Sequence, residues 1–563
     1  MVRIMSEFSS SSSSALDAAV LNLIREEVLQ TPPGFDTQSD LFAAGLDSMA
    51  IMQMLLLLEE RFGVNLPVET VSRENFQSAA SIAKLLAGRG VKLESADEPV
   101  KQEVTPSSPS PVPEVSAKFD RLSLRDCDFF VVAFDQMLRS SGQVGHIAHS
   151  LLELERVPDV AALKQLVAEL PERFPIFNAR LKRRWGIGFP EWVPASKPQP
   201  IEFRLWSHES SAGETRKHGA EVFANEQSLL EDIINAPLEH GREAWANARF
   251  DLIEKADGTC VFVYSWSHLI TDGVGAEHFL VEMARLLGAD HAPVPPFEKD
   301  DGEKPRGWGE RWKSAAPIVM RFYKLLERPF DSLAPKNAHP SRTQFRVVKL
   351  TKAQTEEAAR RSAASSGPLL NMPFHLAYAM RAHRRIFQLR GEKPESLMCC
   401  VPVQVRKKGA RGPLFQNNLT MFFTSLGLDE METVEQAAAK LTEQHAAFLK
   451  DKLGDAFRDL MWMMRPMPPG LHMKFIHWQM KGQFSSFYHS HTGVFAPELE
   501  VFAGAKVESA YHIPGFSSPP GTGVFANEKN GRLILTFAWR EGVLTKDEQD
   551  AMVEQVLKDL GAV

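Results

Sequence analysis

The chain has 563 residues, of which 44% are hydrophobic and 24% charged, and its formal net charge is −7. This balance argues against a nucleic-acid-binding protein, which would carry a basic surface, and no apolar run reaches the about 18 residues that a membrane-spanning helix needs. The four cysteines form no CxxC pair, and the N-terminus has no apolar signal core, so we expect reduced thiols and a cytoplasmic location.

The first predicted domain, residues 15–90, is entirely helical. Helices are predicted over 16–29 and 79–86, and between them lies Gly45-Leu46-Asp47-Ser48-Met49, immediately before a strongly apolar helical run. A serine in the first turn of a helix exposes its hydroxyl beside free backbone N–H groups, at the positive end of the helix dipole, and this environment suits a phosphate. Such a serine is usually only an N-cap. The interpretation of Ser48 as a phosphate site therefore depends on the order of the surrounding helices.

The segment Leu46-Asp47-Ser48-Met49 resembles the 4'-phosphopantetheine site of acyl carrier proteins, with Ser48 at the attachment position. The resemblance covers residues 15–90 and implies a small all-α, four-helix acyl carrier domain. It also implies 4'-phosphopantetheine bound covalently to Ser48 and a phosphopantetheinyl transferase as a partner. We therefore expect the rest of the chain to use a thioester-bound acyl group.

Residues 91–118 form a predicted linker. They hold five prolines, several serines and glutamates, and no aromatic residue. Such a segment cannot bury enough apolar surface to fold, and its prolines keep it extended. It would tether a small domain to a large one and raise the effective concentration of any bound cargo.

The remaining residues, 119–563, alternate predicted strands and helices. Helices are expected over 160–169, 276–287 and 547–560, the last one after a capping box at Thr545 and Glu548. Strands are expected over 144–155, 260–266, 345–350, 397–403 and 532–539. This order predicts an α/β domain of two lobes, about 119–300 and 301–563.

The predicted strand that ends at Trp266 leads into Ser267-His268-Leu269-Ile270-Thr271-Asp272-Gly273, and a helix begins near Val274. A histidine on a tight turn between a strand and a helix is held rigidly, yet its ring can face a cleft. Asp272 can hold the local backbone or pair with a cation, and Gly273 permits backbone angles that other residues resist. The HxxxDG spacing alone is weak evidence, because it often arises by chance.

This segment resembles the HHxxxDG signature of the chloramphenicol-acetyltransferase-like superfamily. That superfamily includes nonribosomal peptide condensation domains, plant HxxxD acyltransferases, polyketide-associated acyltransferases and wax ester synthases. The resemblance makes His268 the counterpart of the catalytic base, and Ser267 replaces the first histidine. The plant enzymes rely on the second histidine alone, so a serine at the first position is compatible with activity. It nevertheless weakens assignment of this chain to the peptide-forming branch.

A second segment, Val401-Pro402-Val403-Gln404-Val405-Arg406, followed by Gln416-Asn417-Asn418, resembles a stretch of the ester-forming members. Arg406 lies where those proteins place an arginine that can pair with the motif aspartate, here Asp272. The resemblance extends over most of residues 119–563. It implies a chloramphenicol-acetyltransferase-like α/β fold of two lobes and direct transfer between two bound substrates.

Neutral imidazole, with a pKa near 6.5, can take a proton from a hydroxyl or amine as that group attacks a thioester carbonyl. We therefore predict an acyltransferase of natural-product or lipid biosynthesis, with His268 as general base and Asp272, Gly273 and Arg406 in structural roles. Two alternatives stay open: a nonribosomal-peptide-type condensation domain that forms an amide, and a non-catalytic protein that only docks carriers. The sequence contains no recognisable loading module, so charging requires an acyl-loading enzyme or upstream synthase in trans, with another carrier protein as a possible partner.

Two further features have competing interpretations. His489 and His491 would share one strand face, but no third ligand stands near them, so no metal site is expected. The basic segment 406–411 is most often a solvated loop, and the alternative is a docking surface for acidic carrier helices or phosphate.

Overall fold

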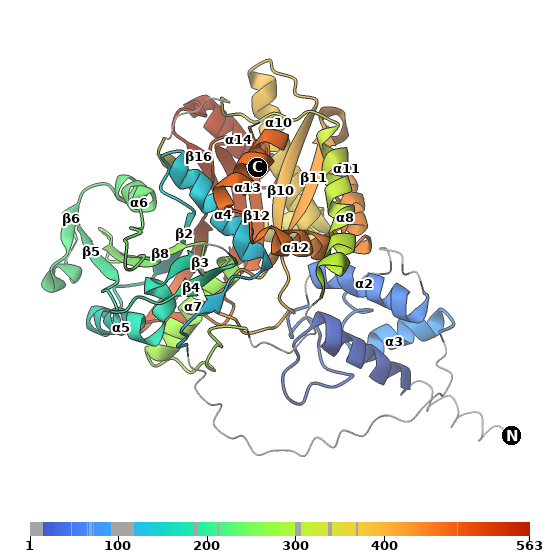
Figure 1. The fold of residues 1–563 in the computed structure, drawn as a ribbon, viewed down its shortest axis with the longest axis horizontal. Helices are drawn as coiled ribbons and strands as arrows, with labels where there is room; N and C mark the ends of the chain where they lie inside the picture. The colour runs from blue at the N-terminus through green and yellow to red at the C-terminus, as the bar shows by residue number, and fades with distance from the viewer. Residues whose placement is uncertain are drawn as a thin grey trace.

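The computed structural model describes residues 15–46, 48–64, 66, 70, 72–91, 117–183, 188–211, 213–298, 306–335, 341–367, 370–480 and 482–563. Asp47 of the predicted attachment motif and most of the predicted linker, residues 92–116, lie outside these residues. A small helical domain and a large α/β domain are visible in Figure 1, with the helical domain in blue. In the described part of the chain, none of the helices combines the length and apolar character that crossing a bilayer would require.

The helical domain contains helical residues 15–23, the π-helical turn η1 (Ile24–Val28), α2 (Ser48–Phe62) and α3 (Ala79–Gly88). In α2, Ile51, Met54, Leu55 and Leu58 are buried, and their spacing places one apolar stripe against the other helices. Ser78 caps α3, since its hydroxyl accepts a hydrogen bond from the N–H of Ser81. The all-helical prediction for this domain is confirmed.

The first lobe of the large domain is built on a seven-stranded sheet. Its order is β13 (Val501–Phe502), β14 (Ala505–Ile513), β2 (Ile147–Leu154), β8 (Cys260–Ser267), β7 (Ala248–Glu254), β5 (Glu202–His208) and β6 (Glu221–Phe223). The helices in this part of the chain are α4 (Asp126–Ser140), α5 (Val160–Arg173), α6 (Glu226–Asn235) and α7 (Gly273–Leu286), with short 3-10 turns η3 (Pro175–Asn178) and η5 (Thr215–His218). A small sheet adds β1 (Leu122–Ser123), β4 (Pro190–Val193) and β3 (Arg180–Arg183).

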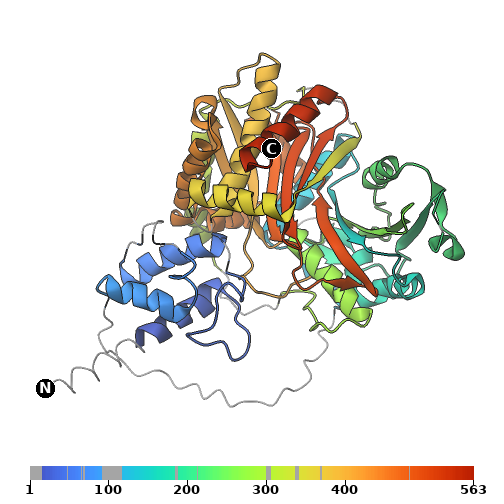
Figure 2. The ribbon, with the colours of Figure 1, turned by 180° about the vertical axis from the view of Figure 1, so that it is seen from behind.

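The second lobe is built on a six-stranded mixed sheet, seen from behind in Figure 2. Its order is β11 (Leu419–Gly427), β10 (Ser396–Gln404), β12 (Phe487–Val494), β15 (Thr522–Lys529), β16 (Arg532–Arg540) and β9 (Thr343–Lys349). The helices are α8 (Trp308–Leu326), α9 (Lys352–Ser366), α10 (Asn371–Leu389), α11 (Val434–Lys450), α12 (Leu453–Met464), α13 (Pro469–Gln479) and α14 (Lys546–Leu560), with the 3-10 turn η6 (Leu428–Met431). The predicted capping box of α14 is confirmed, because Thr545 and Glu548 bond each other's backbone N–H.

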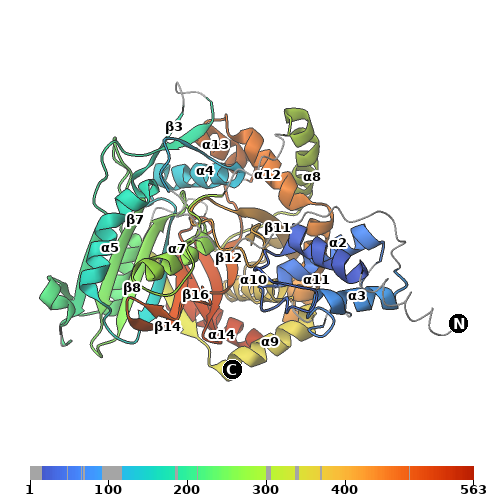
Figure 3. The same cartoon turned by 90° about the horizontal axis from the view of Figure 1, so that it is seen from below.

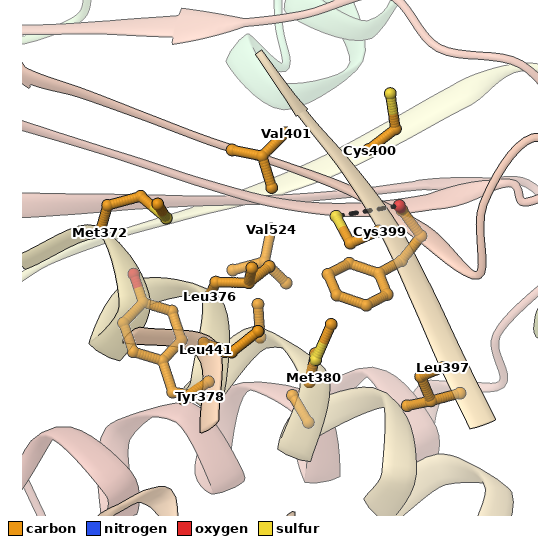
Figure 4. Close-up of a cluster of buried hydrophobic side chains, with 14 of the residues drawn as sticks. Met372, Leu376, Tyr378, Met380, Leu397, Cys399, Cys400, Val401, Leu441 and Val524 are labelled. Carbon is orange, nitrogen blue, oxygen red and sulfur yellow. Dashed lines mark hydrogen bonds between the residues drawn. The ribbon is translucent and has the colours of Figure 1, made fainter. Parts of the chain in front are cut away.

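Helix α10 packs against the centre of the second sheet. Figure 4 shows Leu376 and Met380 of this helix facing Val401 of β10 and Val524 of β15, and the cysteine Cys399 lies among them. All four cysteines of the chain are buried and free. Strands β10, β12 and β15 run parallel. Of these, β10 is buried along most of its length, and its sequence is accordingly largely apolar.

The two lobes share one strand region. After β12 the chain leaves the second sheet, and β14 pairs antiparallel with β2 of the first before β15 returns. Residues from both sheets pack in one cluster that includes Leu151 and Val263 on one side and Phe525 and Ile534 on the other. Strands that follow the predicted boundary near residue 300 therefore complete the sheet of the first lobe.

Candidate active site

His268 lies in the turn between β8 and α7, the position that the sequence predicts. Strand β8 is buried along its whole length, and α7 begins at Gly273. Asp272 is the N-cap of α7, because its Oδ1 accepts the N–H of Gly275 at 2.9 Å. A buried strand and a capped helix thus hold the turn from both ends.

A hydrogen bond to Asn417 orients the His268 ring. The Asn417 amide nitrogen donates to Asp128 Oδ1 at 2.9 Å and to the carbonyl oxygen of His268 at 3.0 Å. The Asn417 side-chain oxygen is therefore an acceptor, and His268 Nδ1, 3.1 Å away, is the donor. This network assigns the proton to Nδ1 and leaves Nε2 as the basic nitrogen.

Asp128 anchors this network from α4. Its carboxylate is buried, and it accepts the backbone N–H groups of Asn417 and Arg125, each at 2.9 Å. Burial raises the pKa of Asp128 above its ordinary value, although these hydrogen bonds offset part of the effect. Asp128 thus orients Asn417, and Asn417 in turn orients His268. Outer hydrogen-bond partners orient histidines at metal sites in the same way.

The His268 ring is uncharged near neutral pH. Burial lowers the pKa of His268 below its ordinary 6.5, and the charge of Asp272 compensates only partly. His268 as a whole residue is nevertheless partly exposed. These are the properties of a general base.

The structure brings Asp272 and Arg406 together. Arg406 Nη1 lies 2.7 and 2.6 Å from the two carboxylate oxygens, and the backbone N–H of Asn418 donates to the same carboxylate at 2.7 Å. Burial by itself would raise the pKa of Asp272, but the charge and hydrogen bonds of Arg406 outweigh it and hold the pKa below its ordinary value. The carboxylate is fully engaged, and this arrangement fits a structural role.

Gly273 does not have the backbone role that the sequence suggests. Its φ lies outside the left-handed region, and a Cβ built there would meet no atom closer than 3.9 Å. The crowded glycine is Gly275, where a Cβ would lie 2.1 Å from the Thr271 hydroxyl and 2.7 Å from the Leu414 carbonyl oxygen. The close approach of the loop to α7 therefore requires Gly275.

Residues 405–418, which we call the bridging loop, connect the site to the helical domain. Its two ends supply the site, one with Arg406 and the other with Asn417 and Asn418. In its middle, Lys408 forms two backbone hydrogen bonds with the helical domain: its carbonyl oxygen accepts from the N–H of Gln30 at 2.8 Å, and its N–H donates to Val28 at 3.1 Å. The predicted basic docking segment thus contacts this domain, and the main chain of Lys408 makes two of the contacts.

Two further contacts hold the helical domain in place. Gly409 packs so closely against Gly45 that a Cβ on Gly45 would lie 3.0 Å from the Gly409 nitrogen. Leu370, just before α10, is buried within the core of the helical domain. In Figure 3 this domain lies beside α10 and α11. Ser48, the predicted attachment residue, begins α2 shortly after Gly45.

The other predicted candidates do not form a second site. His489 donates through Nδ1 to the Val524 carbonyl oxygen, and His491 stacks on His375. Among the described residues, no group of three His, Cys, Asp or Glu side chains could hold a metal ion. A cavity of about 570 Å³ is lined by Phe119, Pro171 and Asn178, and His268, Asp272 and Arg406 are not among its lining residues.

Sequence reasoning missed the roles of Asp128 and His146, whose ring lies against that of His268. Asp128 is one acidic residue in an ordinary amphipathic helix, and His146 stands just before a strand. Neither has a local motif, since each acquires its partner only through tertiary contacts.

Comparison with known families identifies the helical domain. The family described as "Phosphopantetheine attachment site" matches residues 18–86. Residues 18–86 are a carrier domain. No curated protein matches this chain. The prediction of a helical carrier domain therefore has support from both structure and family.

Solved structures identify the fold of the large domain. The first condensation domain of the calcium-dependent antibiotic synthetase is 15% identical, with a TM-score of 0.54, and the match covers 78% of this chain and 95% of that one. Trichothecene 15-O-acetyltransferase from Fusarium sporotrichioides is 11% identical, with a TM-score of 0.53 and coverage of 78% and 95%. The starter condensation domain of rhizomide synthetase is 13% identical, with a TM-score of 0.51 and coverage of 79% and 94%. The large domain therefore has the fold of these condensation domains and of this acetyltransferase, as predicted.

Proposed function

We propose that this chain is an acyltransferase that moves an acyl group from a carrier-bound thioester to a hydroxyl or amine acceptor, with His268 as general base. One observation carries the proposal. The hydrogen bond from His268 Nδ1 to Asn417 leaves Nε2 as the basic nitrogen of a neutral ring, on a residue that is partly exposed. A carrier domain on the same chain supplies the setting for a thioester donor.

In the proposed reaction, His268 Nε2 accepts the acceptor's proton while the acceptor oxygen or nitrogen bonds to the acyl carbonyl carbon. The bond between that carbon and the thioester sulfur breaks, and the proton passes from Nε2 to the thiolate. While His268 is positively charged, the Asn417 side-chain oxygen continues to accept the hydrogen bond from Nδ1. The Asp128 carboxylate holds Asn417 in place by accepting a hydrogen bond from its amide nitrogen. Asp272 holds the turn and the bridging loop and takes no proton.

The residues at the start of α2 fit a phosphopantetheine group. Ser48 begins this 15-residue helix, and the positive end of a helix dipole suits a phosphodiester. When bound there, the group supplies a thiol that carries the acyl chain as a thioester. Gly45, just before this helix, contacts Gly409 of the bridging loop, whose end reaches His268.

The proposed partners follow from this scheme. A phosphopantetheinyl transferase modifies Ser48, and a loading enzyme or upstream synthase supplies the acyl group. The chemistry at His268 suits ester and amide formation equally, because either acceptor loses one proton to the base. Octan-1-ol and octylamine as test acceptors separate an ester-forming enzyme from an amide-forming one.

The test uses the full chain loaded from octanoyl coenzyme A by a broad-specificity phosphopantetheinyl transferase. Intact-protein mass spectrometry should show one octanoyl-phosphopantetheine adduct, which Ser48→Ala abolishes. With either acceptor, His268→Gln should lose the octanoyl mass about 10²- to 10⁴-fold more slowly than the wild type. Equal rates would reject His268 as the base and favour a protein that only docks carriers. An adduct on the Ser48→Ala variant would reject the attachment site.

A further inference from the structure

The His268 ring lies against a second imidazole, that of His146. The ring centroids are 4.3 Å apart, and the ring planes differ by 8°. Ile147, the first residue of β2, pairs with Ser267, the last of β8, and the His268 N–H donates to the His146 carbonyl oxygen at 2.9 Å. The two histidines are therefore opposite one another just beyond the paired strands, and this register places both side chains on one face.

Helix α4 holds His146 in this position. The His146 N–H donates to Asp135 Oδ1 at 2.7 Å, and the edge of the Phe134 ring packs against the His146 ring at a centroid distance of 4.9 Å. Asp135 is in turn paired with Arg139 at 2.9 Å. These contacts fix the backbone and the ring of His146 independently of His268.

The His146 imidazole is uncharged. Its Nδ1 is buried and has no hydrogen-bond partner, so protonation would bury an unpaired charged N–H group. Burial and the neighbouring His268 lower the pKa of His146 well below 6.5. The Trp266 ring also packs against His268, at 5.1 Å and 47°. Two uncharged rings therefore contact the His268 imidazole.

We propose that His146 is a positioning residue for His268: by stacking, it holds the plane of the imidazole and shields it from water. This proposal rests on the proposed function, because it assumes that His268 is the base. The Asn417 hydrogen bond fixes one edge of the ring but still allows the ring to tilt about that bond. The stack removes the tilt and fixes the direction in which Nε2 points.

The charged groups around the two rings are mostly paired with one another. They are Asp272 with Arg406, Glu277 with His512, Asp135 with Arg139, and Asp128, which accepts from Asn417. Removal of the His146 ring leaves these pairs in place and admits water to one face of His268. Because burial is the main cause that lowers the pKa of His268, its pKa should then rise toward 6.5.

The test is a histidine titration by NMR in the full chain labelled with ¹³C at histidine Cε1, with the His268 signal assigned from His268→Gln. The wild-type midpoint should lie below 6.5. His146→Ala should raise it, while His146→Phe, which keeps a flat apolar ring, should leave it near the wild-type value. His445→Phe, which changes a buried histidine of α11, serves as the matched control and should leave it unchanged.

Octanoyl transfer supplies a second readout. His146→Ala should slow transfer about tenfold or more, and His146→Phe should retain most of the rate. An unchanged midpoint in His146→Ala, or an equal rise in His146→Phe, would overturn the proposal. If His146→Ala does not fold, His146→Asn replaces it with the same expectations. The titration needs no acyl substrate, so it tests the role of His146 separately from the proposed function. If the proposed function is wrong, the wild type itself transfers no octanoyl group.

Discussion

Arg406 Nη1 lies 2.6 Å from Oδ2 of Asp272, and the two side chains are only 5% and 3% exposed. Asp272 precedes α7 in the first lobe, whereas Arg406 follows β10 in the second. The ion pair therefore fastens one lobe to the other directly beside His268. Its carboxylate also caps α7 and accepts the Asn418 N–H, so the pair is connected to both sides of the site.

Loss of either partner would leave an uncompensated buried charge. We expect Asp272→Ala and Arg406→Ala each to lower the free energy of unfolding by about 3–5 kcal/mol. The double variant should lose clearly less than the sum, because the second substitution no longer strands a charge. Urea titration followed by tryptophan fluorescence measures this in the large domain, since no tryptophan lies within residues 1–184. Additive losses would show that the pair is not coupled.

The two glycines at the start of α7 should respond in opposite ways. Gly275→Ala places a Cβ against the Thr271 hydroxyl and the Leu414 carbonyl oxygen, and such overpacking costs about 1–3 kcal/mol. Gly273→Ala makes only ordinary van der Waals contacts in a helix, where alanine is preferred to glycine, so stability should be unchanged or slightly higher. The same urea titration compares the two variants. A larger loss from Gly273→Ala would contradict the packing described here.

Adding one methyl group at Gly409, by substitution with alanine, should weaken its contact with the carrier domain. A Cβ on Gly409 would lie 2.5 Å from the Ala44 carbonyl oxygen, so Gly409→Ala should release the carrier from the bridging loop. Gly531→Ala is the matched control, because its φ of 71° is close to the 73° of Gly409 but its nearest atom is 3.8 Å away. Small-angle X-ray scattering should show a larger radius of gyration only for Gly409→Ala. Identical scattering from both variants would mean that this contact does not hold the carrier.

Stability should fall as the pH drops from neutral to acid. Burial lowers the pKa of many histidines, to about 3 for His149 and His489 and about 4 for His383 and His445. Below pH 6.5 the unfolded chain therefore binds more protons than the folded one. The contribution of these histidines to the free energy of unfolding is fully present above pH 6.5 and is lost as the pH falls toward their pKa values in the folded state. Melting temperatures at pH 7.5, 6.5, 5.5 and 4.5 should decrease in that order. His445→Phe should reduce this dependence, and a melting temperature that rises toward pH 5.5 would contradict the prediction.

Local patterns in the sequence determined much of this protein. The apolar spacing after Ser48 predicts α2, the strand-turn-helix around His268 predicts β8 and α7, and Thr545 with Glu548 predicts the start of α14. Each of these signals depends on neighbours a few residues apart, where helix periodicity, strand burial and capping act. Family resemblance added the expectation that Arg406 would face Asp272.

Only the tertiary structure decided how these parts meet. His146 faces His268 because β2 pairs with β8, and Asp128 reaches the site because α4 packs beside the bridging loop. The main chain of Lys408 forms two hydrogen bonds with the carrier domain, and backbone hydrogen bonds of this kind leave no signal in the side-chain sequence. Contacts between residues more than a hundred positions apart follow from strand register and packing, which leave no pattern in the local sequence.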